Sequence, residues 1–282
     1  MLKIAIPNKG SLSEAAVRIV GDAGYRVRRT GRELMLSDDA NGVEFVFLRP
    51  RDIAIYVSNG VLDLGITGRD LAQDSGAEVA ELLPLGFGKS KFYYAVPDGS
   101  VLTPERFNGL CIATSYPNLV AADLEKRGVK ARVVRLDGAI EISIELGVAD
   151  LIADVIQTGN TMKAAGLKTV GDPVIESEAV LIGRNDNSLE NPAAQTFLER
   201  LKGIVVAREY VMVEYDVAES ALDAACGVTP GIEAPTIAPL TRKGWVAVKA
   251  MSRKRDINQI MDDLSRLDAR GIIVTDIKTC RV

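Results

Sequence analysis

Short apolar stretches alternate with polar turns and amphipathic segments along most of the chain. Residues 151–156, for example, are apolar on both faces of an extended strand except at Asp154, which suits a strand covered on both sides of a parallel sheet. Residues 11–14 (Ser-Leu-Ser-Glu) follow the first apolar stretch with the spacing of a helix capping box. Alternating strands and helices predict an α/β fold. The expected strands span residues 2–6, 43–48, 62–67, 92–96, 110–115, 129–136 and 151–156.

The order of these elements predicts two α/β lobes joined by two crossings. The chain completes one lobe, crosses to a second, and returns through a strand expected at 174–182, interrupted at 176–178 (Glu-Ser-Glu), and a helix expected at 192–203. This return is typical of two-lobed, periplasmic-binding-protein-like (type II) folds, whose ligand lies in the cleft between the lobes. We therefore expect lobe I at residues 1–91 with 178–207, and lobe II at residues 92–177.

The order of elements changes after residue 204. Strand, helix, strand, strand, helix and strand follow one another, which is the split arrangement of ferredoxin-like domains. A small C-terminal domain of this kind, with few candidate catalytic groups, is more often a regulatory or assembly module than a catalytic one. We expect it at residues 208–282. Its elements are expected at residues 204–215, 220–226, 236–240, 245–251, 257–267 and 272–276.

The composition narrows the possible functions. Of the 282 residues, 47% are hydrophobic and 26% charged, as in soluble globular proteins. The formal net charge of −4 argues against a general nucleic-acid-binding protein, which needs a basic surface. No apolar run is long enough to span a membrane, and the first residues suit a strand better than a signal peptide. The three cysteines are far apart and odd in number, which fits reduced thiols without zinc in a cytoplasmic protein.

The chain contains no histidine. This absence excludes a Ser-His-Asp triad, an imidazole general base and a histidine-ligated metal. Any chemistry must therefore use carboxylates, amines, hydroxyls, backbone dipoles or a hard cation such as Mg²⁺.

A polar loop at residues 157–161 (Gln-Thr-Gly-Asn-Thr) follows the strand at 151–156 and precedes a short helix expected at 163–166. A loop in this position directs backbone N–H groups at one point, which favours phosphate binding. Asp154 lies near the same strand end, where open α/β sheets hold their ligands, and its carboxylate suits sugar hydroxyls or a metal ion. Phosphate, ribose and Mg²⁺ together suggest 5-phosphoribosyl-1-pyrophosphate (PRPP). The alternative is an ordinary strand, turn and capped helix.

Three further β-to-α turns carry polar side chains at strand ends. Lys9 with Gly10, Arg49 and Asp70 follow the first three of the expected parallel strands. Three such residues on one edge predict a site for an anionic ligand, although solvated side chains in ordinary turns remain the alternative. Glu141 is expected in the first turn of a helix, where it either stabilises the helix dipole or contacts the ligand.

Several segments stand in an order and at a spacing that are typical of one family. They are residues 7–10 (Pro-Asn-Lys-Gly), 48–50 (Leu-Arg-Pro), 63–70 (Asp-Leu-Gly-Ile-Thr-Gly-Arg-Asp), 136–141 (Leu-Asp-Gly-Ala-Ile-Glu), 149–155 (Ala-Asp-Leu-Ile-Ala-Asp-Val) and 234–236 (Ala-Pro-Thr). Together they resemble the long form of ATP phosphoribosyltransferase, the first enzyme of histidine biosynthesis, across essentially the whole chain. The resemblance implies reaction of ATP with PRPP, a requirement for Mg²⁺, an ACT-like domain that binds histidine as a feedback effector, and dimers that assemble into a hexamer.

The resemblance also implies roles for single residues. Catalysis would involve Lys9, Arg49 and Asp154, and Mg²⁺ would lie near Asp154 and Glu141. The residues expected to bind PRPP are Glu141, Asp154, Gln157, Thr158, Gly159, Asn160 and Thr161. Those expected to bind ATP are Lys9, Gly10, Arg49, Asp70, Leu71 and Tyr116. Those expected to bind histidine are Asp216, Thr236, Met251 and Gly271. For Arg32, a further role is left as an open question, namely that its side chain reaches the active site of a neighbouring subunit.

Two other interpretations remain. A type I phosphoribosyltransferase has a similar PRPP loop, but that loop normally begins with two adjacent acids, whereas Ala153 precedes Asp154 here. A non-catalytic, two-lobed solute-binding or ligand-sensing protein would not need a phosphate loop beside an acid, and it would usually carry a secretion signal.

Overall fold

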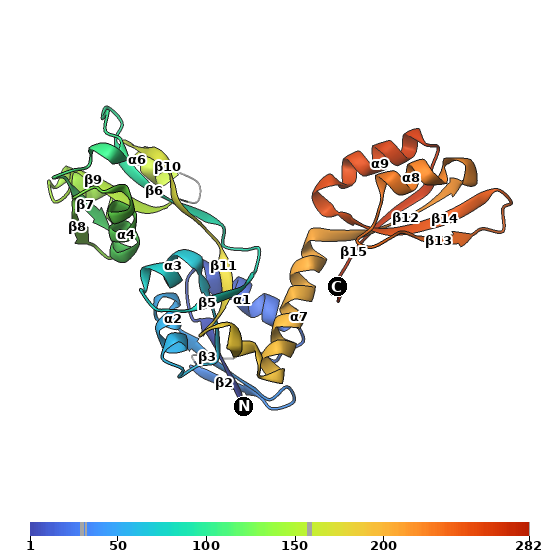
Figure 1. Ribbon diagram of the computed structural model, residues 1–282, viewed down its shortest axis with the longest axis horizontal. Coiled ribbons are helices and arrows are strands. Elements are labelled where there is room, and N and C mark those ends of the chain that lie inside the picture. The colour runs from blue at the N-terminus through green and yellow to red at the C-terminus, as the bar shows by residue number, and fades with distance from the viewer. Residues whose placement is uncertain (29–30, 32, 157–159, 282) are drawn as a thin grey trace. The chain divides into compact units, whose positions relative to one another are not determined.

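The computed structural model describes residues 1–28, 31, 33–156 and 160–281 (Figure 1). The side chains of residues 160, 161 and 186 lie outside this description. The chain divides into two compact units, the first made of residues 1–21 and 25–198 and the second of residues 22–24 and 199–282. Within the described part of the chain, no helix has the length and the apolar character needed to cross a membrane.

A mixed sheet with the strand order β2-β3-β1-β4-β11-β5 forms the first part of unit 1, here called lobe I. Strands β3, β1 and β4 are parallel neighbours, whereas β11 runs antiparallel to both β4 and β5. The strands are β1 (Leu2–Pro7), β2 (Met35–Asp38), β3 (Val43–Leu48), β4 (Leu64–Gly68), β5 (Ala80–Pro84) and β11 (Ala179–Gly183). The helices beside it are α1 (Ser11–Asp22), α2 (Pro50–Ser58), α3 (Arg69–Asp74) and the start of α7 (Pro192–Glu209).

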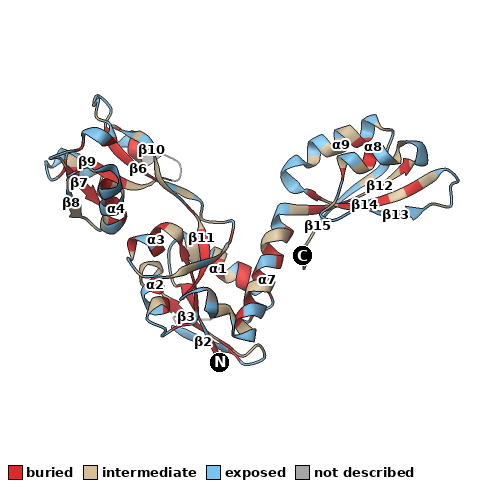
Figure 2. Ribbon diagram, in the orientation of Figure 1, coloured by how far each residue is buried: buried red, intermediate tan, exposed pale blue. Residues whose placement is uncertain are grey.

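The apolar strands of lobe I are buried because helices and aromatic side chains cover the sheet. Ile4 and Ile6 of β1 have no exposed surface. Phe197 of α7 lies with its ring centroid 5.1 Å from that of Tyr25 and 6.5 Å from that of Phe45. Figure 2 shows the resulting concentration of buried residues in the central strands. This core fixes the positions of the β-to-α turns at the strand ends.

A second mixed sheet, with the order β10-β6-β9-β7-β8, forms lobe II of the same unit. Its core contains Phe92, Tyr94, Phe107, Tyr116 and Leu151. The strands are β6 (Ser90–Pro97), β7 (Cys111–Thr114), β8 (Arg132–Arg135), β9 (Leu151–Ile156) and β10 (Leu167–Ser177). The helices are α4 (Pro117–Arg127), α5 (Ile142–Glu145) and α6 (Asn160–Ala164). The chain passes between the lobes twice, from β5 to β6 and from β10 to β11.

The expectation of a parallel sheet around residues 151–156 was only partly right. Strand β9 runs parallel to β7 but antiparallel to β6. Strand β6 arrives directly from lobe I without a crossover helix, so its direction is not constrained by a βαβ unit. Strands β2 and β5 were not predicted. Neither has an apolar core-facing pattern, since β5 contains no buried residue and Met35 of β2 is 54% exposed.

The second unit contains the expected β-α-β-β-α-β order, with the strand order β13-β14-β12-β15 in its sheet. Alternate residues of β12, namely Val211, Val213, Tyr215 and Val217, pack on Leu264 and Ala225 from the two helices. The elements are β12 (Tyr210–Ala218), α8 (Leu222–Val228), β13 (Thr236–Pro239), β14 (Trp245–Arg253), α9 (Ile257–Arg266) and β15 (Arg270–Asp276). The predicted fold class, a two-lobed α/β core with a ferredoxin-like C-terminal module, is confirmed.

The predicted strand at residues 204–215 was wrong in its first half. Helix α7 continues to Glu209, and β12 begins only at Tyr210. The run Ile204-Val205-Val206 favours a strand by local propensity, but tertiary packing overrides it. Gly203 is required inside the helix for a separate reason. A Cβ atom there would lie 2.1 Å from the carbonyl oxygen of Cys280, so the C-terminal segment packs directly against this turn.

Candidate active site

The three charged β-to-α turns of lobe I lie at the carboxyl ends of neighbouring parallel strands. Pro7 of β1 pairs with Leu48 of β3, so Lys9 and Arg49 leave the sheet from adjacent strand ends. Asp70 follows β4, which is the other neighbour of β1. Gly10 adopts a φ of 81°, which allows the turn into α1. Lys9 and Arg49 have exposed side chains and Asp70 is buried, so this edge combines accessible cations with one shielded carboxylate.

Asp154 lies on β9 of lobe II, opposite Tyr93 of β6. Burial raises the pKa of the Asp154 carboxyl group to about 6, although the N–H of Val155 donates to it at 2.8 Å and lowers that pKa. The charge of Glu141 raises the pKa of Asp154, and the charge of Arg51 lowers it. Asp154 is therefore a half-buried carboxyl group within electrostatic reach of a carboxylate on its own lobe and a guanidinium on lobe I.

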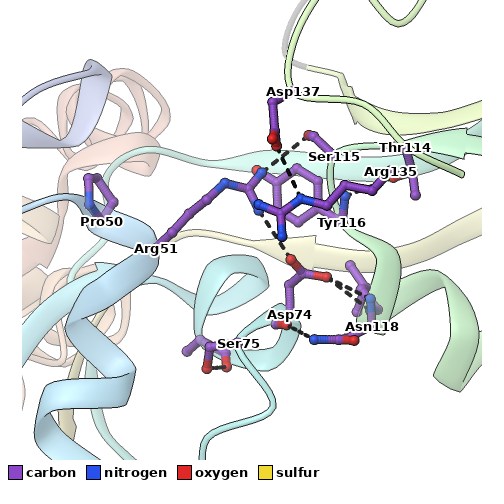
Figure 3. Close-up of polar contacts among 12 residues, drawn as sticks. Pro50, Arg51, Asp74, Ser75, Thr114, Ser115, Tyr116, Asn118, Arg135 and Asp137 are labelled. Carbon is purple, nitrogen blue, oxygen red and sulfur yellow. Dashed lines mark hydrogen bonds and ion pairs between the residues drawn. The ribbon is translucent and has the colours of Figure 1, made fainter.

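Arg51 reaches from lobe I to lobe II (Figure 3). It lies in the first turn of α2, and its Nη1 donates to Asp74 Oδ2 at 3.1 Å. Its Nη2 donates to Ser115 Oγ of lobe II at 3.2 Å. The guanidinium carbon lies 4.3 Å from the centroid of the Tyr116 ring, within the range of a cation–π interaction. A single arginine thus joins α2, α3 and the start of α4.

Tyr116 contributes a protonated hydroxyl group beside Asp70. Burial raises the pKa of the Tyr116 phenol well above its ordinary value, and the charge of Asp70 and its hydrogen bond to the phenol raise it further. The hydroxyl therefore remains a hydrogen-bond donor at neutral pH. Asp70 Oδ1 also accepts a hydrogen bond of 2.8 Å from Ser177 Oγ, at the end of β10. Asp70 consequently links lobe II with one of the two crossings between the lobes.

Arg69 connects the two crossings between the lobes. Its Nε and Nη2 donate to the Glu81 carboxylate at 2.8 and 2.7 Å, and its Nη1 donates to the carbonyl oxygen of Glu176 at 3.2 Å. Glu178 lies within 3.7 Å of the same guanidinium. The hydrogen bonds to Glu81 raise the pKa of Arg69. This pairing holds β5 and the β10–β11 junction together next to Asp70.

The predicted PRPP loop falls largely outside the described residues. Gln157, Thr158 and Gly159 are not described, nor are the side chains of Asn160 and Thr161. The backbone resumes with α6, which begins at Asn160. The assignment of loop 157–161 to phosphate binding stays a prediction. Arg32 also lies outside the described residues.

The carboxylates near Asp154 fit a hard divalent cation. Among the described residues, no group of three acidic or cysteine side chains is placed to enclose a metal ion. Mg²⁺ is commonly held by one or two carboxylates together with substrate phosphates, so it does not need such a cage. Glu141 is the N-cap residue of α5 and makes no side-chain capping hydrogen bond, so its carboxylate is not committed to the helix end. Asp154 and Glu141 therefore suit an ion that is bound jointly with its substrate.

The residues expected at the effector site lie in the sheet of the second unit. Asp216 is inside β12 and pairs with Ala247 of β14, and Thr236 begins β13 and pairs with Lys249 of β14. Because Val213, Tyr215 and Val248 point to the helix side, Asp216 and Thr236 lie on the opposite, open face. Met251 shares this face, and Gly271 lies in the edge strand β15.

Asp216 does not cap helix α8. The N-cap residue of α8 is Ala221, which makes no side-chain capping bond.

Comparison with known proteins decides the family. The pattern of the ATP phosphoribosyltransferase family (HisG) matches residues 49–203, and that of the HisG C-terminal domain matches residues 207–279. The chain belongs to the ATP phosphoribosyltransferase family. An ATP phosphoribosyltransferase of Salinibacter ruber is 60% identical over 283 residues, and one of Corynebacterium jeikeium is 54% identical over 283 residues. Both matches cover 100% of each chain. A solved ATP phosphoribosyl transferase (HisG:HisZ) complex from Thermotoga maritima has a TM-score of 0.64 at 27% identity, covering 73% of this chain and 99% of that one.

Membership of the ATP phosphoribosyltransferase family favours that activity over the type I enzyme and the non-catalytic sensor. It does not assign roles to residues, and the structure adds two that the sequence reasoning missed. Arg51 was overlooked because Arg49 occupies the strand end, yet the helix turn directs Arg51 toward lobe II. Asp74 ends a helix, where a carboxylate opposes the helix dipole. That mismatch is a sequence signal that its partner lies elsewhere.

Proposed function

We propose that this protein transfers the 5-phosphoribosyl group of PRPP to N1 of the adenine ring of ATP. The products are N1-(5-phospho-β-D-ribosyl)-ATP and pyrophosphate, and the reaction opens histidine biosynthesis. The observation that carries the proposal is Asp154, a half-buried carboxyl group near Arg51 and Glu141 at the strand end that leads into loop 157–161. The family and the relatives of up to 60% identity support the same reaction.

The reaction suits an active site without histidine. Adenine N1 attacks the anomeric carbon of PRPP, the N1–C1′ bond forms, and the bond from C1′ to the pyrophosphate oxygen breaks. N1 carries a lone pair and no proton, so no general base is needed. The protein must align the two substrates and stabilise the negative charge that collects on pyrophosphate. Alignment alone contributes about 7–11 kcal/mol in favourable cases.

The cations at the edge of lobe I supply that stabilisation in our proposal. Lys9 and Arg49 leave adjacent strand ends with exposed side chains and are assigned to ATP and the departing pyrophosphate, with Gly10 and Leu71 beside them. The protonated hydroxyl of Tyr116 donates to Asp70, and this leaves the phenolic oxygen as an acceptor for a donor group of the nucleotide. Asp154 is assigned to the ribose hydroxyls of PRPP, and loop 157–161 to its 5-phosphate.

Mg²⁺ is the divalent ion that we assign to this reaction, with Asp154 and Glu141 as its protein ligands. When bound, the ion would neutralise pyrophosphate oxygens. The electrostatics of Asp154 support this assignment: burial chiefly, and then the charge of Glu141, raise the pKa of its carboxyl group, and a bound cation would offset both effects.

The second unit is proposed to sense histidine. Asp216, Thr236 and Met251 share the open face of a sheet whose other face is packed against α8 and α9, and Gly271 lies in its edge strand. The carboxylate of Asp216 would pair with the amino group of the amino acid. We propose the domain limits 1–91 with 178–207, 92–177 and 208–282. We also propose a cytoplasmic homo-oligomer in which dimers form a hexamer.

The test incubates the purified protein with ATP, PRPP and Mg²⁺ and follows the absorbance of the N1-substituted adenine. Activity that requires all three, and that falls in Asp154→Ala with loss of PRPP binding, is expected. Asp150→Asn is the matched control, because Asp150 directly precedes the same strand and its carboxylate accepts a hydrogen bond of 2.8 Å from the Cys111 N–H, away from the proposed site. Release of pyrophosphate without the adenine product, or unchanged PRPP affinity in Asp154→Ala, would contradict the proposal.

A further inference from the structure

Asp74 is a buried carboxylate at a position where its own helix does not stabilise it. It is the last residue of α3 and only 7% exposed. The C-terminal end of a helix carries partial negative charge, which disfavours a carboxylate. A buried carboxylate is retained only when hydrogen bonds and opposite charge compensate for lost solvation. Its partners therefore show what the residue does.

The partners of one oxygen lie on lobe II. Asp74 Oδ1 accepts hydrogen bonds from the backbone N–H groups of Asn118 and Leu119, at 3.0 and 3.1 Å. The backbone carbonyl of Asp74 accepts a further bond of 2.7 Å from Asn118 Nδ2. The first N–H groups of a helix have no partner inside the helix. Tyr116, the N-cap residue of α4, provides no side-chain cap. Asp74 therefore caps α4 from the opposite lobe.

The other oxygen holds Arg51. Asp74 Oδ2 accepts from Arg51 Nη1 at 3.1 Å, and this contact directs the guanidinium over the Tyr116 ring (Figure 3). The contact between the lobes is also apolar, since Leu71 of α3 packs against the core of lobe II. One carboxylate thus fixes two things at once, the cation above Tyr116 and the helix that begins next to Tyr116.

We propose that Asp74 is a positioning residue for the phosphoribosyl transfer. It does not touch the substrates. It sets the guanidinium of Arg51 and the start of α4 in one arrangement, so that Tyr116, assigned to ATP, and Asp154, assigned to PRPP, are held in one site beside Arg51. A cap supplied by α4 itself would form in any arrangement of the lobes, whereas this cap forms only when α3 and α4 meet. The inference rests on the proposed function, which places the reaction between lobe I and lobe II.

A double-mutant cycle on kcat/KM tests the proposal. Asp74→Asn keeps an oxygen for the α4 amides but removes the charge that holds Arg51, and Arg51→Ala removes the guanidinium. Displacing a catalytic group by about 1 Å can cost about 100-fold in rate. We expect Asp74→Asn to lower kcat/KM by about 10- to 100-fold, chiefly through kcat, and the double variant to be no worse than Arg51→Ala.

The matched control is Asp123→Asn. The Asp123 side chain is 11% exposed and bonds Tyr94 and Arg127 inside lobe II, compared with 9% for the Asp74 side chain. This control should lose stability without changing kcat. If Asp74→Asn retains full kcat/KM, or if its loss multiplies with that of Arg51→Ala, the positioning role is wrong. Should Asp74→Asn fail to fold, Ser115→Ala releases the same guanidinium from lobe II and should show the same non-multiplying loss.

Amide hydrogen exchange tests the contact without any catalysis. Asn118 and Leu119 should exchange slowly in the wild type and in Asp123→Asn, and faster in Asp74→Ala. Equal exchange in all three proteins would remove the cap across the lobes. The two proposals can fail separately. If exchange at Asn118 and Leu119 rises in Asp74→Ala, the cap between the lobes is supported. If Asp154→Ala in the same set of experiments still binds PRPP fully, only the proposed PRPP site is contradicted.

Discussion

Asp154→Asn should make the substrate-free protein more stable at high pH while it abolishes PRPP binding. Burial raises the pKa of Asp154 from 3.8 to about 6. Between these two values the unfolded chain releases its proton and the folded protein keeps it, so the wild type loses stability as pH rises. One pH unit corresponds to 1.36 kcal/mol, so the ionised carboxylate costs about 3 kcal/mol at pH 8 and about 1.5 kcal/mol at pH 5. Asparagine avoids this cost and still accepts the Val155 N–H.

The assay is urea unfolding followed by circular dichroism at pH 8 and pH 5. The free energy of unfolding of Asp154→Asn should exceed that of the wild type by up to about 3 kcal/mol at pH 8, with about half that gain at pH 5. Fluorescence of Trp245, the single tryptophan, follows the second unit as an internal control. Asp150→Asn should show no gain. A gain that is equal at both pH values, or a loss at pH 8, would refute the reasoning that the ionised carboxylate is strained by burial.

Other changes test separate contacts. Tyr116→Phe keeps the ring beneath Arg51 but removes the hydroxyl beside Asp70, so the KM for ATP should rise by about 3- to 10-fold in steady-state assays; an unchanged KM would separate the hydroxyl from nucleotide binding. Arg69→Ala breaks the hydrogen bonds that join the two crossings, so it should lower the free energy of unfolding by about 1 kcal/mol in the same urea assay. Its control, Lys91→Ala, breaks only an exposed ion pair with Glu176 and should change the free energy of unfolding by under about 0.5 kcal/mol. Truncation after Glu209, which leaves α7 whole, should abolish inhibition by histidine and leave catalytic activity. A truncated protein that histidine still inhibits would contradict the proposal that the second unit senses histidine. Asp216→Ala that is inhibited as fully as the wild type would exclude Asp216 from the histidine site.

The parts of the fold that could be predicted are those encoded by local patterns. The apolar strands at Leu2–Pro7 and Leu64–Gly68 and the helix after Pro50 follow from periodicity and capping residues. Strand β5 could not be found this way, because none of its residues is buried and its pairing with β11 joins segments far apart in the sequence. The end of α7 was misjudged because three β-branched residues favour a strand locally, whereas in the structure Ile204 and Ala207 are buried on the helix.

The residues of the candidate site also fall into those that could be predicted from local sequence patterns and those that could not. Lys9, Arg49, Asp70 and Asp154 could be proposed from the sequence because each stands at the end of a predicted strand. Arg51 and Asp74 could not, because their partners belong to the other lobe and no local spacing records a contact between lobes. Asp74 ends a short helix and Arg51 looks like a solvated residue of a first turn. Their importance becomes visible only when Ser115, Asn118 and Leu119 are placed beside them.

The contacts between the lobes bear on how the reaction is controlled. A transfer that needs alignment instead of a general base depends on the relative position of its charged groups more than on the acidity of any one group. Here the cation above Tyr116 is held by Asp74 of its own lobe and by Ser115 of the other, and the hydroxyl of Tyr116 lies beside Asp70 of lobe I. Neither lobe therefore contains the complete set. A ligand that binds one arrangement of the lobes more tightly than another shifts the population toward that arrangement, whereas a ligand with equal affinity for both shifts nothing. The proposed histidine effector would act either through such a difference between the lobes or through a change in assembly. Because Asp74 caps α4 only when the lobes meet, amide exchange at Asn118 and Leu119 with and without histidine would measure that difference directly.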